Sequence, residues 1–311
     1  MSMIRTVFLG TPAFAEAHLQ SLIDDEHYDV VGVISQPDRP SGRHMRLTAS
    51  PVKQLAESHG IPVMTPETVK DQRVLQSIAY WKAELAVVVA YGQILPKAFL
   101  DLFPRMVVNV HGSLLPRWRG AAPIQRALMA GDEISGVSLQ VMFEKLDAGP
   151  VIGERKFELK GHDALTAHDK MMELGRELLE VDLMDYVRGN LAAQPQNESL
   201  VTYAPKIEKS EGQIHWNLSA MEIFNRLQGL KLGPGSFTHR LGKKLKIHRV
   251  EVVSATGKPG TVIEMEDEYV VIATGDGGLR VLEIQPESKP KMSVSAYLKG
   301  HPIEVGEVWG E

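Results

Sequence analysis

The sequence predicts an α/β fold in which a parallel, doubly wound sheet is followed by a small β-barrel. Residues 3–9, 14–23 and 29–34 have the patterns of a strand, a helix and a strand, and this βαβ opening predicts parallel pairing. Residues 85–90 and 106–110 are almost entirely apolar, which suits strands buried on both faces. Short strands with glycine-rich turns near the C-terminus predict the barrel.

Composition limits both fold and function. With 311 residues, 43% of them hydrophobic and 23% charged, the chain has the size and make-up of a soluble globular protein of one large domain or two. The net charge of −5 gives no global sign of nucleic-acid binding, so any RNA site must be a local patch. The absence of cysteine excludes disulfides, thiolate metal sites and a cysteine nucleophile.

No segment of the sequence suggests export or a membrane. The N-terminus lacks the layout of a signal peptide, and the longest apolar run, residues 85–91, is far too short to span a bilayer. We therefore expect a cytoplasmic protein without a membrane partner.

The rest of the first part continues the alternation of strands and helices. Ser50 and Pro51 are a capping residue and a first-turn proline, and they predict a helix that ends at Gly60. Further strands are expected at residues 61–64, 134–143 and 151–159, and further helices at residues 67–80, 123–130 and 163–187. The turn at Gly10 lacks a G-x-G-x-x-G pattern, which argues against a dinucleotide site.

The character of the sequence changes after residue 190. Residues 191–207 include a polar, turn-rich stretch, as expected of a linker between a domain at residues 1–190 and a second domain at residues 208–311. The second domain opens with a short helix at residues 220–228. Its strands are expected at residues 245–253, 260–265, 269–274 and 279–285.

Residues 35–50 form the longest expected loop of the first domain. The stretch has no apolar period, and Arg39, Arg43 and Arg46 give it positive charge. A loop of this length in a compact domain is commonly functional or disordered. Both a mobile surface loop and a binding loop are consistent with the composition.

A polar pair ends the strand at residues 106–110. Side chains alternate along a strand, so Asn109 and His111 point the same way, at the carboxyl end where open α/β sheets place their ligands. Taken alone, the two residues fit two interpretations equally well. One is a functional site, and the other is a capped strand end whose histidine makes ordinary structural hydrogen bonds. The string that follows, Ser113-Leu-Leu-Pro-Arg-Trp-Arg-Gly-Ala-Ala-Pro-Ile-Gln125, is unusual for a structural loop.

This string resembles the signature of the folate-dependent formyltransferases, in which Asn-x-His precedes Ser-Leu-Leu-Pro and a basic, aromatic turn. Its continuation is most similar to the branch that acts on methionyl-tRNA. The resemblance implies a Rossmann-like catalytic domain and an OB-like tRNA-binding domain. It also implies transfer of a formyl group from 10-formyltetrahydrofolate to the amino group of methionine on initiator methionyl-tRNA, a step of translation initiation.

The resemblance also assigns residues to the reaction and to folate. Asp147, in Leu146-Asp-Ala-Gly149, stands at the third catalytic position with Asn109 and His111, although an acidic residue beside Ala-Gly-Pro is otherwise only a turn. Ser138 matches a position that is usually threonine or serine. The folate pocket would be lined by Gln93, Ile94, Leu95 and Pro96, a stretch that a plain strand-to-helix turn explains equally well, and by Ser113, Leu114, Leu115 and Pro116.

Contacts with tRNA would come from three basic segments. His44 and Met45 depart from the family's more basic string in the loop at 35–50, and Arg43 is the contact expected there. Residues 226–249 contain seven Lys or Arg and no Asp or Glu, which suits an RNA backbone, although a solvated hairpin would carry the same charges. The tRNA-contact residues expected in all are Arg39, Arg43, Arg46, Arg117, Arg119, Lys243, Lys244 and Lys246.

Formyl transfer is acyl transfer and requires neither a metal nor a cysteine. Asn109 can donate amide hydrogens to the tetrahedral oxyanion. His111 in its protonated form can add positive charge and act as a general acid, and Asp147 can accept the proton of the attacking amine. The alternatives are a formyltransferase for another amine, such as an amino-sugar nucleotide, and a non-catalytic tRNA-binding protein. We expect a monomer without a metal or an obligate protein partner.

Overall fold

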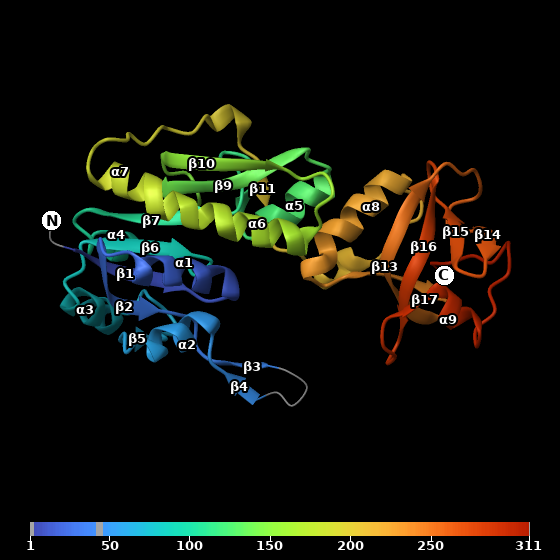
Figure 1. Cartoon of the computed structure of the whole chain (residues 1–311), viewed down its shortest axis with the longest axis horizontal. Coiled ribbons are helices and arrows are strands. Elements are labelled where there is room, and N and C mark those ends of the chain that lie inside the picture. Colours follow the sequence, from blue (N-terminus) through green and yellow to red (C-terminus); the bar gives the residue numbers. More distant parts are fainter. Residues whose placement is uncertain (1–2, 42–45, 311) are drawn as a thin grey trace. The chain divides into compact units, whose positions relative to one another are not determined.

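The computed structural model describes residues 3–41 and 46–310, and the chain forms two compact units (Figure 1). The first unit comprises Met1–Pro123, Ile134–Glu158 and His168–Pro205. The second comprises Ile124–Glu133, Leu159–Ala167 and Lys206–Glu311, so it contains two segments from the first 190 residues as well as the C-terminal part. Within the described ranges no helix has the length and apolar character needed to cross a bilayer.

A seven-stranded sheet organises the first unit, in the order β10-β9-β7-β6-β1-β2-β5. Five of its strands run parallel as predicted: β1 (Ile4–Gly10), β2 (Tyr28–Ile34), β5 (Val63–Met64), β6 (Leu85–Val89) and β7 (Met106–His111). The prediction of an all-parallel sheet is wrong for β9 (Ile134–Val141), which is antiparallel to both β7 and β10 (Val151–Glu158). β9 begins at the same end of the sheet as the one at which β7 ends, so the two strands run in opposite directions.

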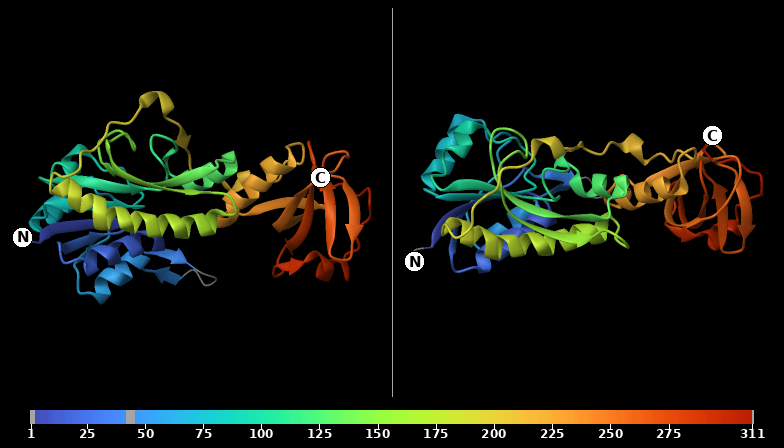
Figure 2. Two further views of the ribbon diagram at one scale, coloured as in Figure 1. Left: turned by 45° about the horizontal axis from the view of Figure 1, so that its top comes forward. Right: turned by 90° about the horizontal axis from the view of Figure 1, so that it is seen from above.

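Helices cover both faces of this sheet (Figures 1 and 2). α1 (Ala13–Asp24) and α2 (Pro51–Ser58) contact each other on one face. α3 (Gln72–Tyr80) and α4 (Lys97–Leu100) lie on the other, where Ile78 and Phe99 join Val7, Leu9 and Val107 in one apolar core. The helix predicted over residues 163–187 consists of α6 (Ala164–Glu177), a π-helical stretch (Leu178–Leu183) and α7 (Met184–Val187).

Two predicted segments differ from the structure for local reasons. α3 begins at Gln72 rather than at residue 67 because the Asp71 side chain accepts a hydrogen bond from the Arg73 amide at 2.7 Å and caps the helix there. The expected irregular loop at residues 35–50 contains a short antiparallel pair, β3 (Arg39–Ser41) and β4 (Arg46–Thr48).

The second unit contains an antiparallel sheet in the order β12-β13-β16-β15-β14, with β17 (Met292–Ser293) added beside β16. Residues 306–310 connect its two edges, since the Val262 amide donates to the Glu307 carbonyl at 2.8 Å and the Gly310 amide donates to the His239 carbonyl at 2.8 Å. The predicted barrel is closed by these bonds. Its strands are β12 (Ser236–Arg240), β13 (Lys243–Val253), β14 (Val262–Glu266), β15 (Tyr269–Ala273) and β16 (Gly278–Pro286).

Three helices belong wholly or mainly to this second unit, namely α5 (Pro123–Ala130), α8 (Ala220–Gly229) and α9 (Val294–Leu298). Ser219 and Glu222 form a capping box that starts α8 close to its predicted first residue. β12 was not predicted, because the glycine-rich stretch before it obscures its alternation. Leu241 and Gly242, with φ of +50° and +69°, make the tight turn from β12 to β13.

A buried histidine on α1 is the most perturbed imidazole of the described part of the first unit. His18 is fully buried, and its Nδ1 donates to the Phe14 carbonyl at 2.7 Å, while Nε2 has no hydrogen-bond partner among the described residues. Gly175 of α6 packs directly on this nitrogen, where a Cβ would approach to 2.3 Å. Burial lowers the pKa of His18 from 6.5 to about 4.

We predict that His18 makes the first unit acid-sensitive. In the unfolded chain His18 is protonated below about pH 6.5, whereas in the folded unit it is protonated only below about pH 4. The contribution of His18 to stability is therefore complete above pH 6.5 and is lost as the pH falls toward 4. From pH 7 to pH 5 the wild type should lose about 2 kcal/mol more unfolding free energy than His18→Gln, measured by urea denaturation. Equal losses in the two proteins would contradict this assignment.

Candidate functional site

The register between β7 and β9 gathers four polar side chains on one face of the sheet. Asn109 pairs with Gln140, and His111 pairs with Ser138. Residues directly opposite each other on antiparallel strands share a face. All four are buried, with exposures of 8%, 1%, 6% and 0% for Asn109, Gln140, His111 and Ser138. Asn109 and His111 therefore belong to a buried polar cluster and not to a solvent-exposed strand end.

Asp147 reaches this site from the loop that follows β9. Its Oδ2 lies 3.8 Å from His111 Nδ1 and accepts a hydrogen bond from the Gly120 amide at 2.9 Å. Its Oδ1 accepts a hydrogen bond from Gln140 Nε2 at 3.1 Å. The structure thus brings His111 and Asp147 together, and Gln140 links Asp147 to the strand position opposite Asn109. Gln140 was not singled out in the sequence, although its alternation with Ser138 along β9 follows from strand geometry.

The His111 ring is held in one orientation. Its Nε2 lies 2.9 Å from the Trp118 carbonyl, which can only accept, so this nitrogen carries a hydrogen. Nδ1 is consequently the ring atom that faces the carboxylate of Asp147. A proton on Nδ1 is therefore the one that this site can hold or release.

The turn after β7 is tied to β9 by a single hydroxyl. Ser138 Oγ accepts from the Leu115 amide at 3.0 Å and lies 2.8 Å from the Ser113 carbonyl, to which it donates. Ser113 Oγ donates in turn to the Arg117 carbonyl at 2.6 Å. The polar side-chain and backbone groups named here thus hold the turn itself. The predicted folate contacts of residues 113–116 stay a prediction.

The second segment predicted to line a folate pocket divides into different roles. Gln93 Oε1 accepts from the Val69 amide at 3.0 Å, so this side chain braces the loop before α3. Leu95 is buried in the core with Phe99, whereas Ile94 is 71% exposed. Pro96 is the N-cap residue of α4. Contact of these residues with folate also stays a prediction.

A groove of about 570 Å³ lies in the first unit at the start of β7. Val107 of β7 lines it, and alternation puts Val107 on the same face as Asn109 and His111. Met142 and the residues just before Asp147 form another wall. The full lining is Lys97, Leu100, Asp101, Arg105, Met106, Val107, Val141, Met142, Phe143, Glu144 and Lys145. The volume suits a small organic ligand, and the apolar walls carry both basic and acidic side chains at their rim. The predicted folate residues 93–96 and 113–116 are not among the lining residues.

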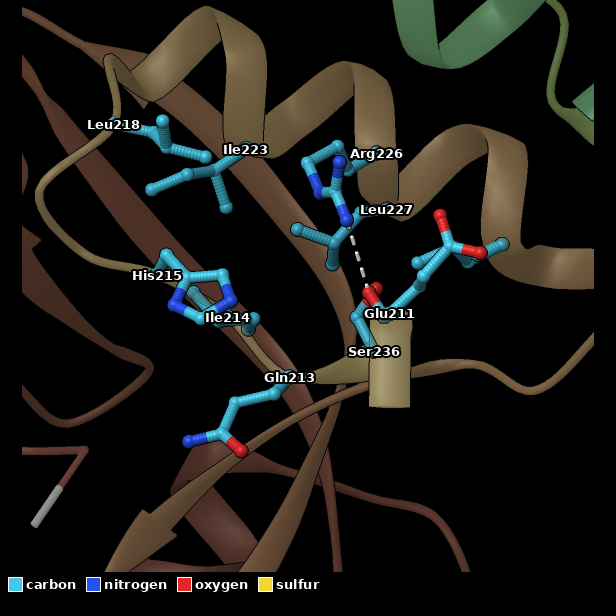
Figure 3. A pocket seen from close by; sticks show the side chains of 10 residues that line it. Glu211, Gln213, Ile214, His215, Leu218, Ile223, Arg226, Leu227 and Ser236 are labelled. Atoms are coloured by element: carbon cyan, nitrogen blue, oxygen red, sulfur yellow. Dashed lines mark hydrogen bonds between the residues drawn. The ribbon is translucent and has the colours of Figure 1, made fainter. Parts of the chain in front are cut away.

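The second unit has a hollow of a different kind (Figure 3). Its volume is about 10 Å³, which is about the space that one water molecule needs. Arg226 of α8 donates to the Glu211 carbonyl at its edge, at 3.2 Å. This hollow is too small for a substrate.

Arg119 is enclosed in protein and does not lie on the surface. Its exposure is 0%, and its guanidinium donates to Gln196 Oε1 at 3.1 Å and 2.7 Å and to Glu198 Oε1 at 2.8 Å. Hydrogen bonds from Arg119 and from Lys145 lower the pKa of Glu198 to about 2. The burial of Arg119 argues against its predicted contact with tRNA, because a side chain without exposed surface cannot meet a phosphate.

The other arginines predicted to bind tRNA in this unit have varied surroundings. Arg39 pairs with Glu67 at 3.4 Å, with both side chains exposed, and Arg46 is exposed. The Arg117 guanidinium carbon lies 4.5 Å from the centre of the Trp118 ring. Arg43 lies outside the described residues.

The bases of residues 226–249 are partly neutralised by acids from elsewhere in the second unit. Arg240 is buried and pairs with Glu307 at 2.6 Å, and Lys231 pairs with Asp163 at 2.9 Å. The expectation of seven uncompensated charges is therefore wrong for these two, since acids distant in sequence meet them. Lys243 and Lys244 are exposed on β13, and Lys246 is half-buried.

Comparison with known proteins is consistent along the whole chain. Residues 4–180 match the formyl transferase family, and residues 206–302 match the formyl transferase C-terminal domain. The methionyl-tRNA formyltransferase of Bdellovibrio bacteriovorus is 53% identical over 317 residues, with 100% of both chains covered. That of Magnetococcus marinus is 43% identical over 312 residues, again with 100% of both chains covered.

Solved structures share the fold at low identity. The sugar 3N-formyl transferase WlaRD, solved in the presence of dTDP and 5-N-formyl-THF, has a TM-score of 0.68 and 17% identity, over 93% of this chain and 100% of that one. HypX from Aquifex aeolicus in complex with tetrahydrofolic acid has a TM-score of 0.66 and 20% identity, over 100% of this chain and 51% of that one. With family matches over both of its parts and relatives of this identity over its full length, the chain belongs to the formyl transferase family.

Proposed function

We propose that this protein transfers the formyl group of 10-formyltetrahydrofolate to the amino group of methionine on initiator methionyl-tRNA. The observation that carries the proposal is the enclosed site in which Asp147 lies 3.8 Å from His111, with Asn109 on the same face of β7 as His111. The relatives that match the full chain act, by their names, on methionyl-tRNA, and we extend that substrate to this chain. We place the reaction in the cytoplasm and propose that the protein acts as a monomer.

The formyl donor fits the groove by shape. Leu100, Val107 and Met142 offer apolar walls to a flat heterocycle. The basic side chains of the groove are paired with acids at 2.6–3.0 Å, so the carboxylates of a folate tail would compete with those acids for them. Val107 shares its face of β7 with Asn109 and His111. A donor seated there would present its formyl group to the polar site.

The residues can divide acyl transfer among them. The amine attacks the formyl carbon, and the Asn109 amide donates to the oxygen that becomes negative. Asp147 accepts one proton from the attacking nitrogen, and His111 delivers the proton of Nδ1 to the folate nitrogen as its bond to the formyl carbon breaks. Transfer of the proton from Asp147 to His111 across their 3.8 Å separation restores the site. The products are a formamide on methionine and a folate nitrogen that carries one hydrogen.

The contacts of tRNA are proposed for basic side chains on both units that are exposed or half-buried. Lys243, Lys244 and Lys246 follow β13, and Lys244 Nζ lies 3.5 Å from the Phe237 ring centre, a pairing that suits a backbone-binding strand. Arg39, Arg46 and Arg117 remain as candidates on the first unit, with Arg43 beyond the described residues. We propose that chemistry belongs to residues 1–190 and most tRNA-backbone binding to residues 208–311.

The direct test is transfer of radiolabelled formyl from the folate to charged initiator tRNA. Elongator methionyl-tRNA is the matched control, since both carry the same amino acid. Product on the initiator alone supports the proposal. Transfer to an amino-sugar nucleotide but to neither tRNA would replace it with the alternative formyltransferase activity, and tRNA binding without any transfer would leave a binding protein.

Replacing Asp147 with Asn should reduce kcat at least about 100-fold, the scale of a lost general acid–base group. The two carboxylate oxygens of Asp147 accept from the Gly120 amide and from Gln140 Nε2. An Asn side chain has only one oxygen, so its NH2 group would face one of these two donors. Folate affinity should change little. Asp169→Asn, at an exposed carboxylate of α6, is the matched control and should keep wild-type turnover. Near-normal kcat in Asp147→Asn would remove this residue from the mechanism.

Leu100→Trp should fill the groove and raise the KM for the formyl donor about tenfold, which corresponds to about 1.4 kcal/mol of lost binding. The kcat at saturating donor should stay close to the wild-type value, because Asn109, His111 and Asp147 are untouched. Val181→Trp adds the same indole at an exposed position and serves as the control. An unchanged KM in Leu100→Trp would place the folate elsewhere.

Changing Lys243, Lys244 and Lys246 together to Ala should flatten the salt dependence of tRNA binding by about two to three units of log K against log [salt], at roughly 0.7–0.9 per phosphate lost. Affinity for the formyl donor should be retained. A triple variant at Lys70, Lys82 and Lys156 removes the same charge from the first unit and should keep the wild-type slope. If the two triple variants gave the same slope, β13 would not contact tRNA phosphates.

A further inference from the structure

The segment that leaves the first unit runs along the proposed active site. The Gln194 amide and carbonyl pair with Val151 at 2.7–2.8 Å. Further on, β11 (Tyr203–Ala204) forms a parallel pair with β8 (Arg119–Gly120), directly after the turn that holds His111. Thr202 Oγ1 accepts from the Trp118 amide at 2.9 Å. Residues 194–204, the connecting segment, are thus fastened to the catalytic turn.

Gln196 in the middle of the connecting segment contacts the Asp147 loop. Its Nε2 donates to the Asp147 carbonyl at 2.8 Å and to the Gly149 carbonyl at 2.7 Å. The same nitrogen lies 3.5 Å from Gln140 Oε1, and Gln140 donates through its own Nε2 to the Asp147 carboxylate. Gln196 therefore contacts both the backbone of Asp147 and the side chain that orients its carboxylate.

Buried Arg119 fixes which way the Gln196 amide faces. A guanidinium has only donors, so the atom of Gln196 that meets Arg119 at 2.7 Å and 3.1 Å must be the oxygen. The amide nitrogen then has to point the other way, to the two loop carbonyls. Arg119 is thus placed to set the direction of the hydrogen bonds that Gln196 makes.

The loop held by Gln196 has a backbone conformation that does not form readily by itself. Asp147 has φ of +46°, a left-handed value that costs a residue with a side chain of order 1 kcal/mol or more. Two residues on, Gly149 passes so close to β9 that a Cβ would overlap the Val141 carbonyl. The bonds that the loop receives from Gly120, Gln140 and Gln196 offset this cost and help to hold Asp147 in this geometry.

We propose that Gln196 is a positioning residue for the transfer reaction, which keeps Asp147 in its left-handed conformation and at its place beside His111. Gln196 acts through Asp147 and Gln140 and need not touch a substrate. The inference rests on the proposed role of Asp147. A displacement of about 1 Å in a catalytic group can cost about 100-fold in rate, so loss of these bonds should appear in kcat.

Gln196→Glu tests this role. The carboxylate can still accept from Arg119, but it cannot donate to the carbonyls of Asp147 and Gly149. We expect kcat for formyl transfer to fall roughly 10–100-fold, with the KM for the formyl donor within about threefold of wild type. The variant should stay folded at the assay temperature, with a lower melting temperature because the new carboxylate oxygen faces two carbonyls. Asn197→Asp, at the exposed neighbouring position, makes the same amide-to-acid change, keeps the side-chain oxygen that caps residues 198–200, and is the matched control that should keep wild-type kcat.

Two further variants keep the test decisive if Gln196→Glu does not fold. Gln196→Ala removes both sets of bonds. The double variant Arg119→Met/Gln196→Met replaces both residues by apolar side chains of similar length, so no buried guanidinium is left without an acceptor. Each folded variant should show the same loss of kcat. If Gln196 served only to pair Arg119, Gln196→Glu would keep kcat within about twofold of wild type, and that result would overturn the proposal.

A measurement without substrate separates this inference from the proposed function. Amide hydrogen exchange of residues 142–150 should be faster in Gln196→Glu than in the wild type and unchanged in Asn197→Asp. Faster exchange with no formyl transfer by the wild type would retain the contact role of Gln196 and refute the proposed activity. Unchanged exchange together with wild-type kcat would refute the positioning role.

Discussion

The antiparallel register of β9 against β7 is the constraint on which the site depends. It sets Gln140 opposite Asn109 and Ser138 opposite His111, and all four side chains then share one buried face. A shift of one residue would turn Gln140 and Ser138 to the opposite face. Ser138 would release the turn after β7, and Gln140 would release the carboxylate of Asp147. One hydrogen-bonding pattern between two strands thus positions residues that lie about 40 apart in sequence.

Much of the fold follows from local rules. The parallel strands carry apolar β-branched runs, Ser50 and Ser219 cap their helices, and the final strands are short and separated by glycine-rich turns. The features that escaped prediction depend on distant partners. The reversed β9 depends on where the chain re-enters the sheet. Barrel closure depends on hydrogen bonds between residues 306–310 and strands that lie about 40 to 70 residues earlier in the chain. Local sequence patterns carry no information about contacts over such distances.

The same distinction applies to the site. Asn109 and His111 could be paired from strand alternation, and Asp147 was assigned only by resemblance to a family. Gln196 could not be found in either way, because its partners come from two other segments and its own surroundings in sequence are those of a linker. Arg119 was predicted to bind tRNA from its place in a basic, aromatic turn of the family signature, and the structure buries it against Gln196 and Glu198. Charge in a sequence does not reveal whether a counter-ion is supplied from elsewhere.

Buried polar groups in this site hold one another in defined orientations. The Trp118 carbonyl requires a hydrogen on His111 Nε2, and the Arg119 guanidinium requires the oxygen of Gln196. A fixed oxygen on Gln196 fixes its nitrogen, which faces Gln140 and the Asp147 loop. Once one residue is fixed as the donor or the acceptor of a bond, its partner can take only the other role. Turning any of these amides around would place donor against donor or acceptor against acceptor, at a cost of about 1–3 kcal/mol per unsatisfied buried group. The network therefore favours one arrangement of His111 and Asp147 over all the alternatives that their side chains could adopt separately.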